Sequence, residues 1–286
     1  MISVVILTYN EAANLPRCLA SIDWCDDVLV VDSGSTDGTR DIARSAGARV
    51  LQRPFDNFAG QRNYAHDQGN LRYEWVLHLD ADEEVTLELL EAMHSVIGSA
   101  NPLDGYRIPA RILFMGRWLK HAGMYPCYQV RFGHRDLLRF HQVGHGQREN
   151  LTLERVGTLD ADLIHHNFSK GVSDWFIRHA RYARDEAKTA YYDDKSVNLR
   201  TILWQQDIVE RRRAIKRLAM KMPLRPLIRF IYVYVLKCGF LDGRAGFRYS
   251  LMLAIYEYMI SLNLHELEQA EELYAEYGEE RTTPKR

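Results

Sequence analysis

The chain has 286 residues, a formal net charge of −1 at pH 7 and 47% hydrophobic residues. This length and apolar content allow one large folded domain with an appendage, and they exclude a disordered chain. The near-zero charge excludes a general electrostatic attraction to nucleic acid, so we expect no nucleic-acid partner.

The cysteines and the apolar segments bear on the cellular compartment. Cys18, Cys25, Cys127 and Cys238 fit neither a disulfide framework nor a CxxC metal motif. Met1 leads directly into a predicted strand, without the basic and apolar regions of a signal peptide. No apolar run reaches the roughly 20 residues that span a bilayer. We therefore expect a cytoplasmic protein with reduced cysteines.

The first hundred residues alternate predicted strands and helices. Aliphatic and β-branched runs predict buried strands at residues 2–7, 28–31, 48–51 and 75–79. Helices are predicted after Asn10, which we expect to cap the first of them, and at about residues 37–46, 60–68 and 87–97. This order predicts an α/β fold with a doubly wound, mostly parallel sheet, whose ligand crevice lies at the carboxyl ends of the strands.

The remainder of the chain follows a different pattern. Residues 104–170 combine short predicted strands with loops rich in aromatic, arginine and histidine residues, and residues 171–286 are predominantly helical. We therefore predict three parts, over residues 1–103, 104–170 and 171–286.

Polar side chains follow three of the predicted strands. The first strand runs into residues 8–11 (TYNE), the second ends at Asp32, and the fourth ends at Asp80 and Asp82. Each group alone could be a helix cap or an acidic loop, but the carboxyl ends of parallel strands meet at one edge of a sheet. Two acids one residue apart suit a divalent cation, which prefers oxygen ligands. The sequence therefore predicts a site for a nucleotide and a metal.

These motifs carry a family resemblance. Residues 6–11 (ILTYNE), 30–39 (VVDSGSTDGT) and 80–82 (DAD) resemble the nucleotide-binding half of family 2 glycosyltransferases, which have the GT-A fold. More narrowly, residues 58–65 (FAGQRNYA), 79–84 (LDADEE) and 239–243 (GFLDG) resemble lipopolysaccharide core β-1,4-glucosyltransferases. The resemblance implies an inverting transfer of a sugar from a nucleotide-sugar, expected to be a UDP-hexose, to a hydroxyl of a lipopolysaccharide-core or lipid-linked glycan. It also makes residues 1–103 the nucleotide-sugar half and residues 104–170 the acceptor-side half.

The resemblance assigns the nucleoside to the first two strand ends. It places the uridine against Thr8, Asn10, Glu11 and Asp32, with Asp32 as the main contact. A carboxylate there can accept hydrogen bonds from uracil N3–H or from ribose hydroxyls, and charge-assisted bonds are the stronger kind.

The resemblance also implies a metal-dependent diphosphate site. Arg62 would lie near the base or the diphosphate, although an exposed helix cation is the alternative. Asp80 would face the ribose and the water ligands of the metal, and Asp82 would bind Mn²⁺ or Mg²⁺ directly. His166 could complete the metal site or contact a phosphate, or it could be a structural histidine.

The catalytic base is expected in the acceptor-side half. Relatives often carry a His-Glu pair after an Arg-Leu-Phe strand, and this chain has residues 129–132 (QVRF) and then His145 and Glu149. Because the spacing from His to Glu is longer than in the family, Glu149 is the first candidate and His145 the second. A polar loop without catalytic function is the alternative.

The helical region suggests a membrane surface. Residues 211–241 hold nine Lys or Arg residues and no acid, and residues 227–236 and 251–260 are apolar around most of a helix. Such segments suit an anionic bilayer surface, which predicts a peripheral protein on the inner face of the cytoplasmic membrane. The alternative is a helical pair packed as an ordinary subdomain.

Four other functions are alternatives. A phosphatase of the haloacid dehalogenase type also has Asp-x-Asp, but it usually has Thr or Val where this chain has Glu84. A nucleotidyltransferase or a dinucleotide enzyme would need a glycine-rich loop after the first strand, and residues 8–11 contain no glycine. A noncatalytic membrane-associated scaffold would require that the acids bind no metal.

Overall fold

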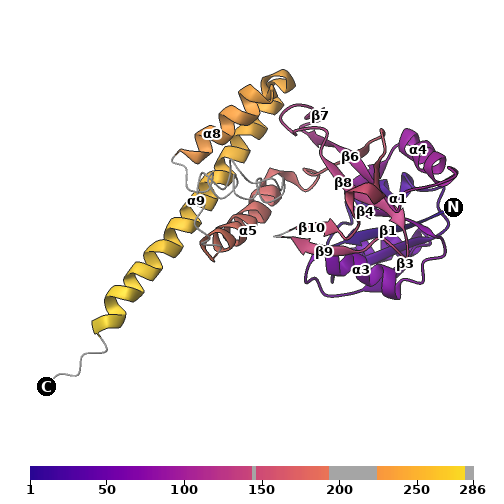
Figure 1. Cartoon of the computed structure of the whole chain (residues 1–286), viewed down its shortest axis with the longest axis horizontal. Helices are drawn as coiled ribbons and strands as arrows, with labels where there is room; N and C mark the ends of the chain where they lie inside the picture. The colour runs from indigo at the N-terminus through magenta and orange to yellow at the C-terminus, as the bar shows by residue number, and fades with distance from the viewer. Residues whose placement is uncertain (144–145, 193–223, 281–286) are drawn as a thin grey trace. The chain divides into compact units, whose positions relative to one another are not determined.

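The structure, a computed structural model, describes residues 1–143, 146–192 and 224–280, with side chains described up to residue 270 (Figure 1). It divides into two units, Met1–Val172 and Ser173–Arg286. His145 and most of the basic segment from Arg211 lie outside the described residues. None of the helices in the described ranges combines the length and hydropathy required to span a membrane.

Four parallel strands form the nucleotide-side part of the first unit. They lie in the order β3 (Arg49–Gln52), β2 (Val28–Asp32), β1 (Ile2–Thr8) and β4 (Trp75–Asp80). All seven residues of β1 are buried, as expected for a central strand covered on both faces. The predicted parallel α/β sheet is confirmed.

Helices cover both faces of this sheet. They are α1 (Leu15–Ala20), α2 (Thr39–Ser45), α3 (Phe58–Gln68) and α4 (Leu87–Ile97). Leu15, Leu89 and Met93 join the core on one face, whereas Ala65 of α3 joins the smaller core on the other face. The sheet is therefore doubly wound, as predicted.

The expected helix cap at Asn10 is wrong. Helix α1 begins only at Leu15, with Asn14 as its N-cap residue. Asn10 instead has a left-handed φ of 53°, and its side-chain oxygen accepts a hydrogen bond from Thr36 N at 2.8 Å. Asn tolerates this conformation better than most residues. Asn10 thus joins the loops after β1 and β2 rather than starting a helix.

The sheet continues beyond these strands with mixed strand directions. The added strands are β5 (Glu83–Val85), β6 (Gly105–Phe114), β7 (Arg117–Trp118), β8 (Tyr128–His134), β11 (Val156–Thr158) and β12 (Leu163–His165). Strand β8 is antiparallel to β4, and β6 is antiparallel to β8. Strands β9 (Phe140–Val143) and β10 (Gly146–Glu149) form a separate two-stranded sheet, followed by a 3₁₀ turn at Leu153–Arg155.

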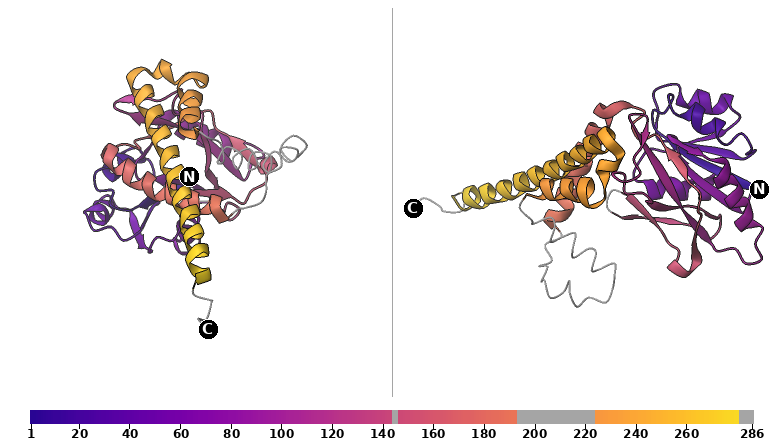
Figure 2. Two further views of the ribbon diagram at one scale, coloured as in Figure 1. Left: turned by 90° about the vertical axis from the view of Figure 1, so that its left-hand side faces the viewer. Right: turned by 90° about the horizontal axis from the view of Figure 1, so that it is seen from above.

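The second unit is helical in its described part (Figure 2). It contains α5 (Gly171–Tyr192), α8 (Arg225–Ile231), a π-helical turn at Tyr232–Leu236, a 3₁₀ turn at Gly239–Asp242 and α9 (Gly243–Glu280). Ala183 and Ala187 of α5 pack with Ile260 of α9 in a small core. Helix α8 also lies alongside α9.

Candidate active site

The predicted nucleoside residues meet at the carboxyl edge of the parallel strands. Thr8 is paired in register with Asp32 across β1 and β2, and Leu7 is paired with Asp80 across β1 and β4. The structure therefore brings the three strand-end motifs to adjacent positions. This is where open α/β sheets bind ligands.

Asp32 organises the loop that follows β2. Its carboxylate is fully buried and accepts hydrogen bonds from Thr8 Oγ1 at 3.0 Å and from the backbone N–H groups of Gly34 at 3.1 Å and Ser35 at 2.9 Å. These bonds compensate the cost of burying the charge. In this arrangement Asp32 presents no surface to a ligand, so direct contact with uridine would require residues 33–36 to move.

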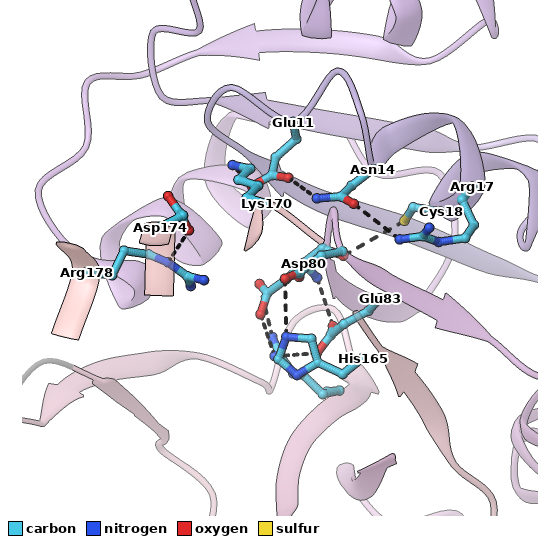
Figure 3. Close-up of polar contacts among 12 residues, drawn as sticks. Glu11, Asn14, Arg17, Cys18, Asp80, Glu83, His165, Lys170, Asp174 and Arg178 are labelled. Atoms are coloured by element: carbon cyan, nitrogen blue, oxygen red, sulfur yellow. Dashed lines mark hydrogen bonds and ion pairs between the residues drawn. The ribbon is translucent and has the colours of Figure 1, made fainter. Parts of the chain in front are cut away.

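Asn10 and Glu11 lie in the neighbouring turn and are also partnered. Asn10 N donates to Ser35 Oγ and Glu11 N donates to Thr39 Oγ1, both at 2.8 Å. The Glu11 carboxylate accepts a hydrogen bond from Asn14 and is paired with Lys170 (Figure 3). Burial raises the pKa of Glu11, although Lys170 opposes the shift. Lys170 thus joins the segment after β12 to the first turn.

Asp80 lies between two buried arginines. Arg62 Nη2 of α3 lies 2.8 Å from Asp80 Oδ1, and Arg131 Nη2 of β8 lies 2.7 Å from Asp80 Oδ2. Arg131 also lies 2.9 Å from Glu83 Oε1, and the other oxygen of Glu83 accepts from Asp80 N at 2.8 Å. Asp80 and Glu83 are drawn together in Figure 3. The first acid of the motif is thus fixed by cations from both halves of the sheet.

Arg62 retains unused donors. Its side chain is 1% exposed, and its Nε and Nη1 atoms have no hydrogen-bond partner in the described part of the chain. Buried donors without acceptors are costly. A carbonyl or phosphate oxygen of a ligand is the chemistry that would satisfy them.

The side chain of Asp82 lies beside His165, whereas the side chain of His166 lies beside Glu84. His165 Nε2 is 3.4 Å from Asp82 Oδ2, whereas His166 Nε2 is 2.5 Å from Glu84 Oε1. His166 approaches Asp82 through its backbone, because its N–H donates to the Asp82 carbonyl at 2.8 Å. The role of His166 as a metal ligand therefore stays a prediction.

The acidic surroundings set the protonation of this cluster. Burial by itself favours the neutral imidazole, but the carboxylate of Asp82, followed by those of Glu83 and Asp80, holds the pKa of His165 at about 9. Burial raises the pKa of Glu83, and the charge of Asp80 adds to this effect. His165 is therefore a cation at neutral pH and offsets part of the acidic charge.

The candidate base Glu149 lies on the β9–β10 hairpin. It is paired in register with Phe140, whose backbone N–H and carbonyl both bond to the Asn63 side chain of α3. The guanidinium carbon of Arg62 lies 5.8 Å from the Phe140 ring centroid. Glu149 is thus attached to the same helix as Arg62, and its catalytic role stays a prediction.

Four residues of this cluster were not predicted from the sequence. Arg131, Glu83, His165 and Lys170 are far apart in the chain or adjacent to a predicted site residue. Arg131 carried one available signal, since an arginine among the apolar residues of a predicted strand requires a buried partner. Lys170 carried none, because its contact with Glu11 joins positions 159 residues apart.

Comparisons with known proteins support this description. The sequence model described as "Glycosyl transferase family 2" matches residues 3–137. An uncharacterized glycosyltransferase of Rickettsia bellii is 38% identical over 117 residues, which are 41% of this chain and 39% of that protein. The lipopolysaccharide core biosynthesis glycosyltransferase LpsC of Rhizobium meliloti is 32% identical over 120 residues, which are 40% of this chain and 44% of that protein. The chain thus covers less than half the length of either relative.

Similar solved structures exist, but at low similarity. TarS of S. aureus has a TM-score of 0.44 at 15% identity, covering 94% of this chain and 91% of that chain. Glucosyl-3-phosphoglycerate synthase from Mycobacterium tuberculosis, solved with Mn²⁺, UDP and glucosyl-3-phosphoglycerate, has a TM-score of 0.47 at 17% identity, covering 70% of this chain and 83% of that chain. Because these TM-scores are low, the evidence for the fold is the strand order and pairing of this chain itself.

Residues 3–137 therefore match the glycosyltransferase family 2 model. The β3-β2-β1-β4 sheet, continued by antiparallel β8 and β6, is the predicted GT-A architecture. One of the relatives that resemble this chain is named for lipopolysaccharide core biosynthesis.

Proposed function

We propose that this protein is an inverting glycosyltransferase that moves a hexose from a UDP-sugar to a hydroxyl of a lipopolysaccharide-core or lipid-linked glycan. The observation that supports this best is the meeting of Thr8, Asp32 and Asp80 at one edge of a sheet in the part of the chain that matches the family 2 model. An acidic motif at this edge can hold a diphosphate through a cation, with the nucleoside in the adjacent crevice.

The donor would be bound by the loops after β1 and β2. Thr8, Asn10 and Glu11 belong to the first loop, and Asp32 fixes the second through its bonds to Gly34 and Ser35. Uridine contacts from Asn10 and Glu11 would come from the first loop. Arg62 would give its unpartnered donors to the base or the diphosphate, which is the charge-assisted pairing that a guanidinium favours.

Mn²⁺ or Mg²⁺ is the proposed cofactor, with Asp82 and His166 as its protein ligands. Within the described ranges, no three His, Cys, Asp or Glu side chains form a group that could hold a metal ion. The donor set therefore suits a cation that takes its remaining oxygen ligands from the diphosphate and water. When bound, such a cation would stabilise the departing diphosphate as a Lewis acid. His166 would exchange its contact with Glu84 for this role.

The chain's own groups would perform the transfer. Glu149, or His145 as the second candidate, would accept the proton of the attacking acceptor hydroxyl. Direct displacement by that hydroxyl inverts the anomeric configuration. A product with the β-configuration, read by NMR of the transferred sugar, is the expected outcome from an α-linked donor, and a retained α-configuration contradicts inversion.

An aromatic and cationic surface in the acceptor-side half supports a glycan with negative charge. Apart from the buried Arg131, five Lys or Arg residues and no acid lie between Gly105 and Arg135 in the sequence. Lys120 Nζ lies 5.6 Å from the Trp118 ring centroid, and the guanidinium carbon of Arg107 lies 5.3 Å from that of Tyr128. Aromatic faces offer apolar contact area, and cations attract phosphate or carboxylate groups. Because glycans of this kind are built on lipids, we place the enzyme on the inner face of the cytoplasmic membrane.

Titration calorimetry with UDP tests the proposed donor site. Wild type is expected to bind UDP at least tenfold more tightly with Mn²⁺ than without, because Asp82 and the diphosphate would share the cation. Asp82→Asn should remove this difference. A control, Asp160→Asn, changes an exposed acid of the same unit and should leave the difference intact. Equal affinity of wild type with and without Mn²⁺ would contradict the metal site, and no UDP binding at all would restore the phosphatase and scaffold alternatives.

A further inference from the structure

The second unit exposes two apolar stripes. On α8 and the following turns, exposed apolar residues recur three or four positions apart, and on α9 a second series does the same. Each of these side chains is between 38% and 70% exposed: Leu224, Leu227, Ile228, Ile231, Val235, Leu236, Phe240 and Leu241, then Phe247, Leu251, Ile255, Tyr258 and Leu262. Single exposed apolar residues are ordinary, but a continuous face of this size marks an interaction site.

These stripes are distinct from the buried core of the same helices. The same helices bury a different face, where Val233, Tyr249, Met252 and Leu253 are each less than 9% exposed. A helix with one buried face normally has a polar outer face. The outer face of this pair, within the described residues, is apolar as well, so it suits a further apolar environment.

The charges beside the stripes are mostly positive. Residues 224–262 contain five cations, Arg225, Arg229, Lys237, Arg244 and Arg248, and two acids, Asp242 and Glu257. Glu257 pairs with Arg225 and lies 3.9 Å from Arg229, so Lys237, Arg244 and Arg248 account for the excess positive charge. Asp242 is 3% exposed, so it adds little to the surface charge. An apolar face bordered by cations is the pattern of a segment that lies on an anionic bilayer.

A pocket lies among these residues. It has a volume of about 510 Å³ and is lined by Tyr234, Gly243, Arg244, Phe247 and Arg248. Arg244 and Arg248 are four residues apart on α9, which places them on the same side of the helix. The rings of Tyr234 and Phe247 lie 5.5 Å apart at 80° and form an aromatic wall. Two guanidinium groups beside aromatic rings suit a phosphate joined to an apolar group.

We propose that this face docks on an anionic bilayer, with its apolar stripes in the interface and a lipid phosphate held by Arg244 and Arg248. The biological purpose of this docking rests on the proposed function, because docking would hold the enzyme near an acceptor in the membrane. The basic residues that were predicted for this role from the sequence lie mainly outside the described ranges. Most apolar residues of the face lie in the segments 227–236 and 251–260 that the sequence predicted for this role, whereas Arg244 and Arg248 lie outside the predicted segments.

A second copy of the chain is the competing occupant. In a two-fold pairing the same surface meets itself, so the arginines and Lys237 would face their own copies. Residues 224–262 carry five cations and two acids, the buried Asp242 and Glu257, which pairs with Arg225, so positive charge is in excess on this stretch and would oppose such a pairing. A bilayer with anionic headgroups instead attracts each cation, by about 1 kcal/mol.

Co-sedimentation with vesicles tests the proposal. The full-length protein is expected to bind phosphatidylglycerol vesicles at low salt and phosphatidylcholine vesicles at least tenfold less. Arg244→Glu with Arg248→Glu should weaken binding to phosphatidylglycerol at least tenfold. Leu236→Ser with Phe240→Ser should weaken the part of vesicle binding that resists high salt, because that part comes from burial of apolar side chains. Both side chains are exposed, so these changes should leave the core undisturbed. The matched control is Arg181→Glu with Arg184→Glu, two exposed arginines of α5, and it should lose less than threefold.

The outcomes separate this proposal from the proposed function. UDP titration with Mn²⁺ should be unchanged in every variant, which also shows that each one is folded. The docking site is wrong if wild type does not bind phosphatidylglycerol vesicles. It is also wrong if the Arg244/Arg248 and Leu236/Phe240 variants bind these vesicles like wild type. Neither result would contradict the donor site. A wild-type dimer in sedimentation velocity that the Leu236→Ser and Phe240→Ser changes dissociate would assign the face to a second copy. Loss of UDP binding in wild type would count against the transferase alone.

Discussion

Arg131 of β8 links the ends of β4 and β5 through its side chain. It contacts Asp80 at the end of β4 and Glu83 at the start of β5, and its side chain is 6% exposed. A buried ion pair adds little net stability, but removing one member leaves an uncompensated buried charge. The consequence is that Arg131 positions Asp80, although Arg131 itself need not touch the donor.

Arg131→Met is expected to destabilise the protein by about 3–5 kcal/mol, because Asp80 loses one of its cations and Glu83 loses its partner. Urea unfolding of wild type and variant measures this difference. Arg44→Met is the control, since Arg44 pairs with Asp41 at an exposed position and such pairs contribute roughly 0–1 kcal/mol. Equal stability of the Arg131 variant and wild type would mean that the buried network contributes nothing to folding.

Glu149→Gln is expected to keep UDP binding and to lose about 10²–10⁴-fold in transfer rate, because the amide has nearly the same shape but cannot accept the proton. Glu154→Gln, at an exposed position five residues further along, is the matched control and should transfer at the wild-type rate. The rates are measured as UDP released in the presence of acceptor. A Glu149→Gln enzyme with normal turnover would move the base to His145 or to another residue.

At the scale of elements, α3 packs on β4 through two histidines. His66 Nε2 and His78 Nε2 lie 2.9 Å apart, and the Phe140 ring contacts His78 edge-on. Burial lowers the pKa of His66 to about 4 and that of His78 well below its usual range. Both rings are therefore neutral in the folded protein at pH 5, whereas in the unfolded chain their pKa is near 6.5.

This difference predicts acid sensitivity. Below pH 6.5 the unfolded chain binds more protons than the folded chain, so the free energy of unfolding falls as the pH falls. The loss between pH 7 and pH 5 is about 2 kcal/mol for each histidine. His78→Leu should remove one such contribution, and His94→Leu, at an exposed position of α4, should not. The measurement is urea unfolding at both pH values. A His78→Leu protein with the full wild-type loss would contradict the assignment.

The sequence predicted elements better than it predicted contacts. Local signals were sufficient for the parallel strands and for α4, which was predicted at residues 87–97 and spans Leu87–Ile97. They failed at Asn10 because its partner Thr36 is 26 residues away, so a tertiary bond replaced the expected cap. They also placed the start of α3 two residues late, since Asn57 caps it by accepting from Gly60 N. The convergence of Thr8, Asp32 and Asp80 followed from strand order, whereas the partners of each carboxylate depended on packing.

At the scale of the whole molecule, the two units have separate cores. Leu77 lies in the main core of the first unit, and Ile260 lies in the core formed by α5 and α9. Units with their own cores can unfold independently. We therefore expect two transitions in scanning calorimetry. Leu77→Ala should lower the midpoint of one and Ile260→Ala that of the other, since each change costs about 2–5 kcal/mol. A single transition that both changes shift equally would show that the units unfold together.

The central place of β1 has a consequence for synthesis. Val4 pairs with Val28 on one side and with Leu77 on the other, so β1 leaves the ribosome long before its second neighbour exists. Until β4 has emerged, a strand that is buried along its whole length in the finished sheet has one open edge. Nascent chains at this stage are substrates for chaperones and prone to association. Pairing of both edges of β1 during translation therefore waits for the segment that carries Asp80.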